Sequence, residues 1–303
     1  MKETLIFKKE RDLGAVITDT FTFIRNEGIE LLKYIIRYGA IPLALVIITI
    51  TIYTHNTLNG FNTNMDEDNL LMILFFMMVS ILVFFTMTNC VVLHYIKSYI
   101  KNDGNVKNTE ISDGVKKSFW SIFGLFFVIG IILVICAVIS VFFMGIAAFS
   151  IDSAWAFLAV FIFIIPLIYL YNVFLISYPI NIFENKRISE TIGYSFTLMK
   201  GEWWMTFLTF LVMYILYYII VLIFQVPFYI YFFANEFYAM QEISADPQTD
   251  WIGLVLNAIG IVAQYLLYGV MVVVAALVYF NLNERKNFTG TIETIDKIGQ
   301  REE

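Results

Sequence analysis

Two histidines, two cysteines and one acidic run are the residues of this 303-residue chain that could do catalytic or metal chemistry. His55 follows the first apolar stretch of the chain, and His94 lies near the end of the second. We therefore expect the two histidines on opposite sides of a membrane, where they cannot share a metal ion. Cys90 and Cys136 fall inside apolar runs, which disfavours a disulfide framework. No zinc-binding histidine pair, phosphate-binding glycine loop or nucleophilic serine turn occurs. The sequence therefore predicts no catalytic residue, no metal site and no cofactor.

The acidic run Asp66-Glu67-Asp68 could hold a cation weakly, although such runs are more often solvated loops. The centres of the apolar stretches contain no charged residue. Proton-coupled pumps and voltage sensors usually need one there, which counts against an active, ion-coupled transporter.

Uncharged polar side chains remain as the candidate site. They recur at helical spacing in the last two apolar stretches, so each set lies on one helix face. The first stretch carries Tyr214, Tyr218, Gln225 and Tyr229, and the second carries Asn257, Gln264 and Tyr268. Facing stripes on consecutive helices predict a polar seam. We favour interhelical hydrogen bonding, worth about 0.6 kcal/mol for each bond; the alternative is a lined cavity for a lipid head group or small solute.

The depth of each amide decides which groups can meet in the seam. Counting about 1.5 Å per residue inward from Phe233 and Trp251 places Gln225 and Gln264 about 10 Å apart along the membrane normal. We therefore expect no direct pair between these amides. Asn257 is the expected partner of Gln225.

The elements that carry these residues are predicted to be six membrane-spanning helices. The chain is 60% hydrophobic and 15% charged, whereas soluble domains are about 25% charged. A span needs roughly 20 apolar residues, and backbone groups in lipid must pair within the helix. The expected spans are Tyr38–Thr54 (extended inward by Leu31–Arg37), Leu70–Ile96, Phe119–Phe143, Ala154–Ile182, Trp203–Phe233 and Trp251–Asn281.

Positive charge is sorted between the segments that connect the spans. Loops 56–69, 147–153 and 234–250 contain no Lys or Arg, and all 19 basic residues lie in the other four segments. By the positive-inside rule those four segments are cytoplasmic. We therefore expect a multi-pass protein of the bacterial cytoplasmic membrane, with both ends of this chain cytoplasmic.

The cytoplasmic segments share an ungapped pattern, [LI]-[GS]-x-x-[IV]-x-x-[ST]-F, which ends at Phe21, Phe119 and Phe196. Its apolar positions fall on one helix face, which predicts short amphipathic helices in the inner interface, at about 11–26, 109–122 and 187–200. A glycine follows each, at Gly28, Gly124 and Gly201, and would permit a turn into the next span. One membrane domain, 1–303, would then hold three repeats of interfacial helix plus hairpin, at about 11–99, 109–184 and 187–283, and a cytoplasmic tail, 284–303.

The third repeat resembles the membrane domain that some bacteria fuse to glycerophosphodiester phosphodiesterases. The resemblance rests on a helix ending in Ser195-Phe196, the basic-Gly turn Lys200-Gly201 and the aromatic-led span at Trp203-Trp204. It implies a membrane location and a fold. It implies no phosphodiesterase activity, because the catalytic barrel of those fusions is absent from this sequence.

These features predict an all-α, integral-membrane six-helix bundle that is not an enzyme. The favoured function is a scaffold or accessory subunit of a membrane assembly, and the alternative is a passive transporter or lipid-handling protein that uses the polar seam. The expected partners are the lipid bilayer and other membrane proteins, without nucleic acid.

Overall fold

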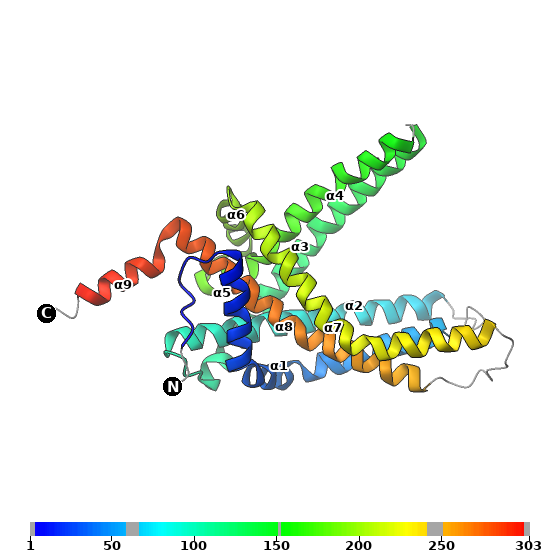
Figure 1. The fold of residues 1–303 in the computed structure, drawn as a ribbon, viewed down its shortest axis with the longest axis horizontal. Helices are drawn as coiled ribbons and strands as arrows, with labels where there is room; N and C mark the ends of the chain where they lie inside the picture. Colours follow the sequence, from blue (N-terminus) through cyan, green and yellow to red (C-terminus); the bar gives the residue numbers. More distant parts are fainter. Residues whose placement is uncertain (1–3, 59–66, 151–152, 241–250, 300–303) are drawn as a thin grey trace.

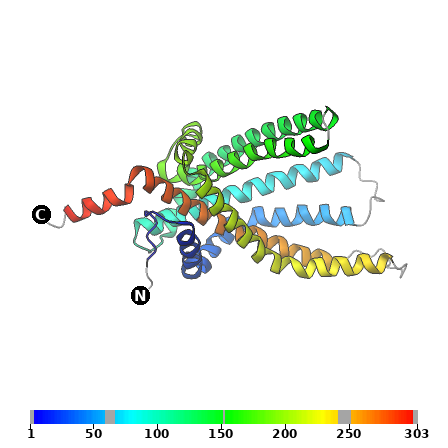
Figure 2. The same ribbon diagram turned by 45° about the horizontal axis from the view of Figure 1, so that its top comes forward.

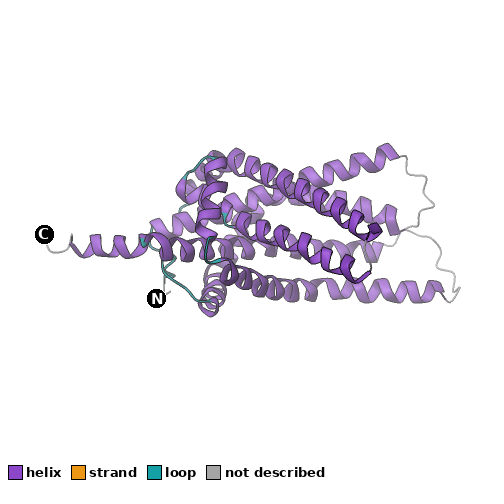
Figure 3. Cartoon of the chain, turned by 90° about the horizontal axis from the view of Figure 1, so that it is seen from above, coloured by secondary structure: helices purple, strands orange, loops and turns teal. Residues whose placement is uncertain are grey.

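The computed structural model describes residues 4–58, 67–150, 153–240 and 251–299. These residues form helices joined by short loops, and no strand occurs among them (Figure 3). The helices are α1 (Leu13–Leu58), α2 (Glu67–Lys101), α3 (Asn108–Ser150), α4 (Ser153–Leu175), α5 (Ser177–Glu184), α6 (Ile188–Met199), α7 (Trp203–Met240), α8 (Trp251–Asn287) and α9 (Thr289–Gly299).

Six stretches of the described chain are long and apolar enough to cross a membrane. They are Leu13–Thr54, Asn69–Lys101, Asn108–Gly145, Ile164–Glu184, Trp203–Asn235 and Trp251–Asn287. Their outward faces are apolar and exposed, as lipid-facing surfaces are: Ile41 is 77% exposed and Phe233 is 67% exposed. The chain is therefore a multi-pass, all-helical membrane protein, as the sequence predicts.

The spanning helices pair as the hairpins α1/α2, α3/α4 and α7/α8, whose tips lie at one end of the molecule (Figure 2). The α3/α4 hairpin diverges from the other two toward its tip (Figure 1). Helices α2 and α8 contribute most of the central packing, with buried runs at Cys90–Ile96 and Met271–Leu282.

The opposite end of the molecule, called the base here, gathers the chain termini with α5, α6 and α9 (Figures 1 and 2). It comprises residues 4–30, 94–122, 176–203 and 279–299. The buried ring of Phe7 meets Phe23, Tyr99 and Phe280 edge-on, at centroid distances of 5.4 to 6.0 Å. The N-terminal segment therefore packs where α1, α2 and α8 meet.

One predicted span, Ala154–Ile182, is not a continuous helix. The structure ends α4 at Leu175, places a turn at Ile176 and begins α5 at Ser177. Pro179 explains the break, because proline has no N–H to donate to the carbonyl four residues earlier and its ring crowds that carbonyl.

Of the three short helices that the sequence predicts for the inner interface, only the third forms a separate helix in the structure. There α6 ends at Met199, and Gly201 takes a left-handed φ of +86° before α7 begins. The predicted turns at Gly28 and Gly124 are wrong, because both glycines lie inside the continuous helices α1 and α3. The first turns of α1 (dark blue) nevertheless run across the direction of the rest of that helix (Figure 1). Gradual bending keeps the backbone hydrogen bonds that a sharp turn would break, and broken bonds are costly near lipid.

Candidate functional site

The two amides at the centre of the predicted seam are bonded to each other. Gln225 Nε2 of α7 donates to Gln264 Oε1 of α8 at 3.2 Å. The prediction that they would not pair is wrong, because it took Phe233 as the outer end of the helix. Helix α7 continues to Met240, seven residues further. At 1.5 Å per residue this extension moves the expected depth of Gln225 inward by about 10 Å, which is enough to cancel the predicted offset.

Neighbouring residues complete this pair on both helices. The Tyr229 hydroxyl donates to Gln225 Oε1 at 3.2 Å, and the hydroxyl of the buried Tyr217 donates to the main-chain carbonyl of Gln264 at 2.8 Å. Gly260 allows the helices to approach, since a Cβ at that position would lie 2.9 Å from Gln225 Cγ. The amides therefore occupy a close helix contact rather than an open channel.

Three other residues predicted for the seam bond to helices outside the α7/α8 hairpin. Asn257, the expected partner of Gln225, instead donates to Thr54 Oγ1 of α1 at 3.4 Å. The Tyr268 hydroxyl accepts from Asn89 of α2 at 3.1 Å. The hydroxyls of Tyr214 and Tyr171 are hydrogen-bonded to each other and join α7 to α4.

Tyr218 differs from the rest of the predicted seam. Its side chain is 57% exposed on the outer surface of α7, where it packs beside the rings of Tyr214 and Tyr217. The stripe therefore does not form one continuous lining. Its residues reach α1, α2 and α4 as well as one another.

The space enclosed near the inner part of the seam is small. A cavity of about 10 Å³ lies among Asn89, Tyr178, Phe210, Tyr268 and their neighbours. One water molecule needs about 10–15 Å³ measured in this way. This cavity has room for no lipid head group and no solute larger than one water.

The residues considered for metal or catalytic chemistry are dispersed. His94 Nε2 lies 2.9 Å from Ser118 Oγ, at the contact of α2 with α3. Within the described ranges no three His, Cys, Asp or Glu side chains are grouped as metal ligands. The side chains of His55 and of the acidic run at 66–68 lie outside the described residues.

Four partners of the seam were not predicted as part of it: Thr54, Asn89, Tyr171 and Tyr217. Asn89 stands out in the sequence as a polar residue within an apolar stretch. Thr54, Tyr171 and Tyr217 gave no such signal, because tyrosine and threonine are common in this chain's apolar stretches. Helical spacing identifies a face of a helix but not the helix that this face meets.

A second polar cluster, which the sequence did not indicate, lies in the base around Arg11. The Arg11 side chain has no exposed surface, and its Nε is 2.9 Å from Asp19 Oδ2. Its guanidinium also donates to the carbonyls of Ile6, Phe7 and Lys9. Burial lowers the pKa of Arg11, and the Asp19 carboxylate opposes that shift. These bonds fix the N-terminal segment against the start of α1.

No family model matches the chain, and comparison with curated proteins and with solved structures found no similar protein. The six long apolar helices alone define the class, which is that of a multi-pass, all-helical membrane protein.

Proposed function

We propose that this protein is a non-catalytic scaffold or accessory subunit of a membrane assembly. The observation that carries the proposal is the pairing of the seam. The groups that could have lined a passage, Gln225, Gln264, Asn257 and Tyr268, are bonded within the chain. Polar residues used in this way hold helices together in lipid.

The proposed setting is a bacterial cytoplasmic membrane with the base on the cytoplasmic side. The sorting of Lys and Arg supports this orientation, because the basic segments meet in the base and the hairpin tips have none.

We also propose that the fold is a closed ring of three repeats. The support is a contact that recurs at the end of each returning helix, where a polar side chain bonds the main chain just before the next repeat. The contacts are Ser98 Oγ accepting from the Lys107 N–H at 3.1 Å, Asn181 Nδ2 donating to the Lys186 carbonyl at 2.9 Å and Asn281 Oδ1 accepting from the Arg11 N–H at 2.8 Å. The third contact joins the end of α8 to the start of α1.

A relationship to the membrane domain of the phosphodiesterase fusions remains a proposal. The local geometry is consistent with it: α6 ends at Met199, Lys200 is extended, Gly201 has a positive φ and α7 begins at Trp203. This turn supports the motif only within the third repeat.

The proposed function is tested by the size and composition of the native assembly. Solubilised in a mild detergent from native membranes, the chain should migrate on a native gel well above its own 35.1 kDa, with a partner protein in fixed ratio. Re-expression in a strain lacking the chain should restore that partner's complex. If the purified chain alone carries a solute or lipid flux in vesicles and no partner co-migrates, the passive transporter is the better proposal.

A further inference from the structure

A long apolar groove runs along the side of α8 away from the seam. It has a volume of about 800 Å³ and lies between α1 and α8, with Phe224 of α7 at its edge. Val255, Ile259, Val262 and Leu266 follow one another at helical spacing along its floor, about 160° around α8 from Gln264. Its lining contains no charged or polar side chain.

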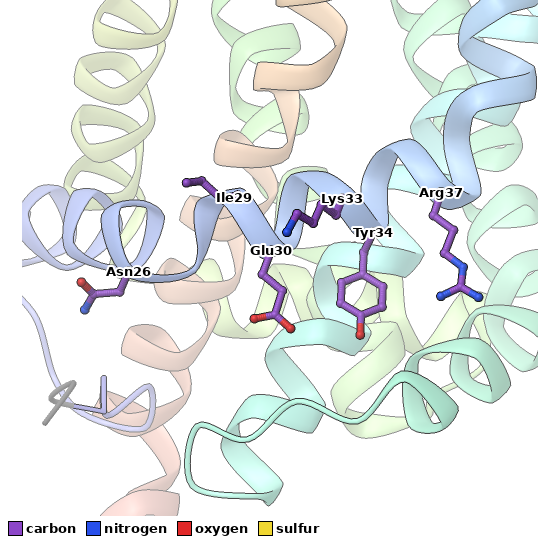
Figure 4. A pocket seen from close by; sticks show the side chains of 6 residues that line it. All are labelled: Asn26, Ile29, Glu30, Lys33, Tyr34 and Arg37. Carbon is purple, nitrogen blue, oxygen red and sulfur yellow. The ribbon is translucent and has the colours of Figure 1, made fainter.

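The end of the groove nearest the base has a positively charged edge. Ile29, which is 77% exposed, lines the groove and also lines an adjoining surface pocket of about 490 Å³ with Lys33 and Arg37 (Figure 4). Arg25 and Lys33 lie four residues before and after Ile29, so they flank it along the helix, and both are exposed.

The acidic residues of this part of α1 reduce that charge but do not cancel it. Glu27 is buried and accepts the Tyr95 hydroxyl at 2.8 Å. Glu30 is exposed and lines the same pocket, three residues before Lys33 (Figure 4). Three exposed cations, Arg25, Lys33 and Arg37, outnumber this one exposed carboxylate, so the edge beside Ile29 has a net positive charge.

We infer that this groove binds an anionic phospholipid of the leaflet next to the base. One acyl chain lies along the floor of the groove and the phosphate pairs with Arg25 and Lys33. From Val255 to Val270 the groove follows α8 for about 22 Å, against about 15 Å for half of the bilayer core, so an acyl chain fits along it.

Charge complementarity selects this occupant over a helix of another protein or of a second copy. An apolar partner helix would fill the floor of the groove but would leave the net positive charge at its edge unmatched. Basic sites beside grooves between spanning helices are typical places for anionic lipid head groups. This inference uses the face of α8 opposite the seam, and it is independent of the proposed scaffold function.

The test measures which lipids stay bound to the purified protein. The chain is reconstituted in equal amounts of phosphatidylglycerol and phosphatidylcholine, extracted gently and analysed by native mass spectrometry. We expect phosphatidylglycerol to be enriched on the wild type. The double variant Arg25→Gln/Lys33→Gln should lose roughly tenfold to 30-fold of that enrichment, because each of the two cations contributes several-fold to the binding of an anionic head group. The matched control Lys107→Gln/Lys116→Gln, which removes two exposed cations of the base elsewhere, should keep it.

A second arm tests the groove itself. Ala263→Phe places a ring on the groove lining and should remove retained lipid of both kinds, while Val134→Phe on the exposed surface of α3 should not. A benzoylphenylalanine at Ile259 should photo-crosslink to lipid. Unchanged enrichment in the Arg25/Lys33 variant would overturn the inference, and so would crosslinking of position 259 to a second copy or to another protein. The charge variant changes exposed residues only, so the test does not depend on whether Ala263→Phe folds.

Discussion

The pair Gln225–Gln264 shows how a polar residue in an apolar helix can serve packing rather than transport. Each amide meets a partner in a close helix contact, and Gly260 makes room for Gln225. Leaving a polar group unpaired in lipid is costly, but the net value of each pair is small.

Replacing Gln225 by Leu should therefore change stability only slightly. In a double-mutant cycle with Gln264→Leu, measured by unfolding in detergent, we expect a coupling energy of about 0.6 kcal/mol. Lipids and proteins that co-purify with the chain should be unchanged. Loss of a co-purifying ligand at unaltered thermal stability would show that these amides belong to a binding site.

Gly114 is the residue at which a small substitution should have a large effect. A Cβ at this position would lie 2.3 Å from the His94 ring, so a side chain would push α3 away from α2. We expect Gly114→Val to cost about 1–3 kcal/mol of unfolding free energy by overpacking. Gly193→Ala is the matched control, because nothing lies within 4 Å of its Cβ position. Equal stabilities of the two variants would mean that α2 and α3 are not this close.

At the scale of elements, the sequence predicted which segments form helices better than where those helices break. Apolar length alone identifies the six spans. Where a helix breaks depends on whether packing in the base compensates a lost backbone bond, which the sequence does not show. This packing decides both the break at Ile176 and the continuous path of the helices through Gly28 and Gly124. The polar stripes were predictable from their spacing, but their partners required the true length of α7 beyond Phe233.

The N-terminal segment depends on one buried ion pair. Asp19→Asn should leave the Arg11 guanidinium buried beside a neutral partner, which costs about 3–5 kcal/mol in well-buried pairs. We expect a smaller cost here, because Asp19 is 15% exposed and also pairs with the exposed Lys9. The expected result is a lower melting temperature and faster proteolysis within residues 4–12. Asp113→Asn, on an exposed position of α3, should change stability by about 0.5 kcal/mol or less. Similar effects of both substitutions would argue that this segment is not held by Arg11.

At the scale of the whole molecule, three hairpins extend from the base (Figure 2). Buried polar contacts join the hairpins both in the base and along the seam, whereas the outward surfaces of the hairpins are apolar and exposed. This division fits a protein whose membrane surface is available to lipid and to other membrane proteins.

The proposed orientation gives a labelling pattern for intact cells. In a background without Cys90 and Cys136, cysteines at Asn62 and Gln248, which lie outside the described residues, should react with an impermeant thiol reagent added outside. A cysteine at Asn108 in the base should react only after the membrane is opened. Labelling of position 108 alone from outside would reverse the orientation.

The most direct test of the structural seam is the access of water to position 264. Gln264→Cys in the same background is treated, in folded detergent-solubilised protein, with a small hydrophilic thiol reagent. Asn108→Cys serves as the exposed control and the denatured Gln264→Cys protein as the reactive control. A packed seam predicts that the folded Gln264→Cys protein reacts at least about 100-fold more slowly than either control, since a thiolate needs water to form. Reaction at a rate close to that of the exposed control would reveal a wet passage and contradict the scaffold account.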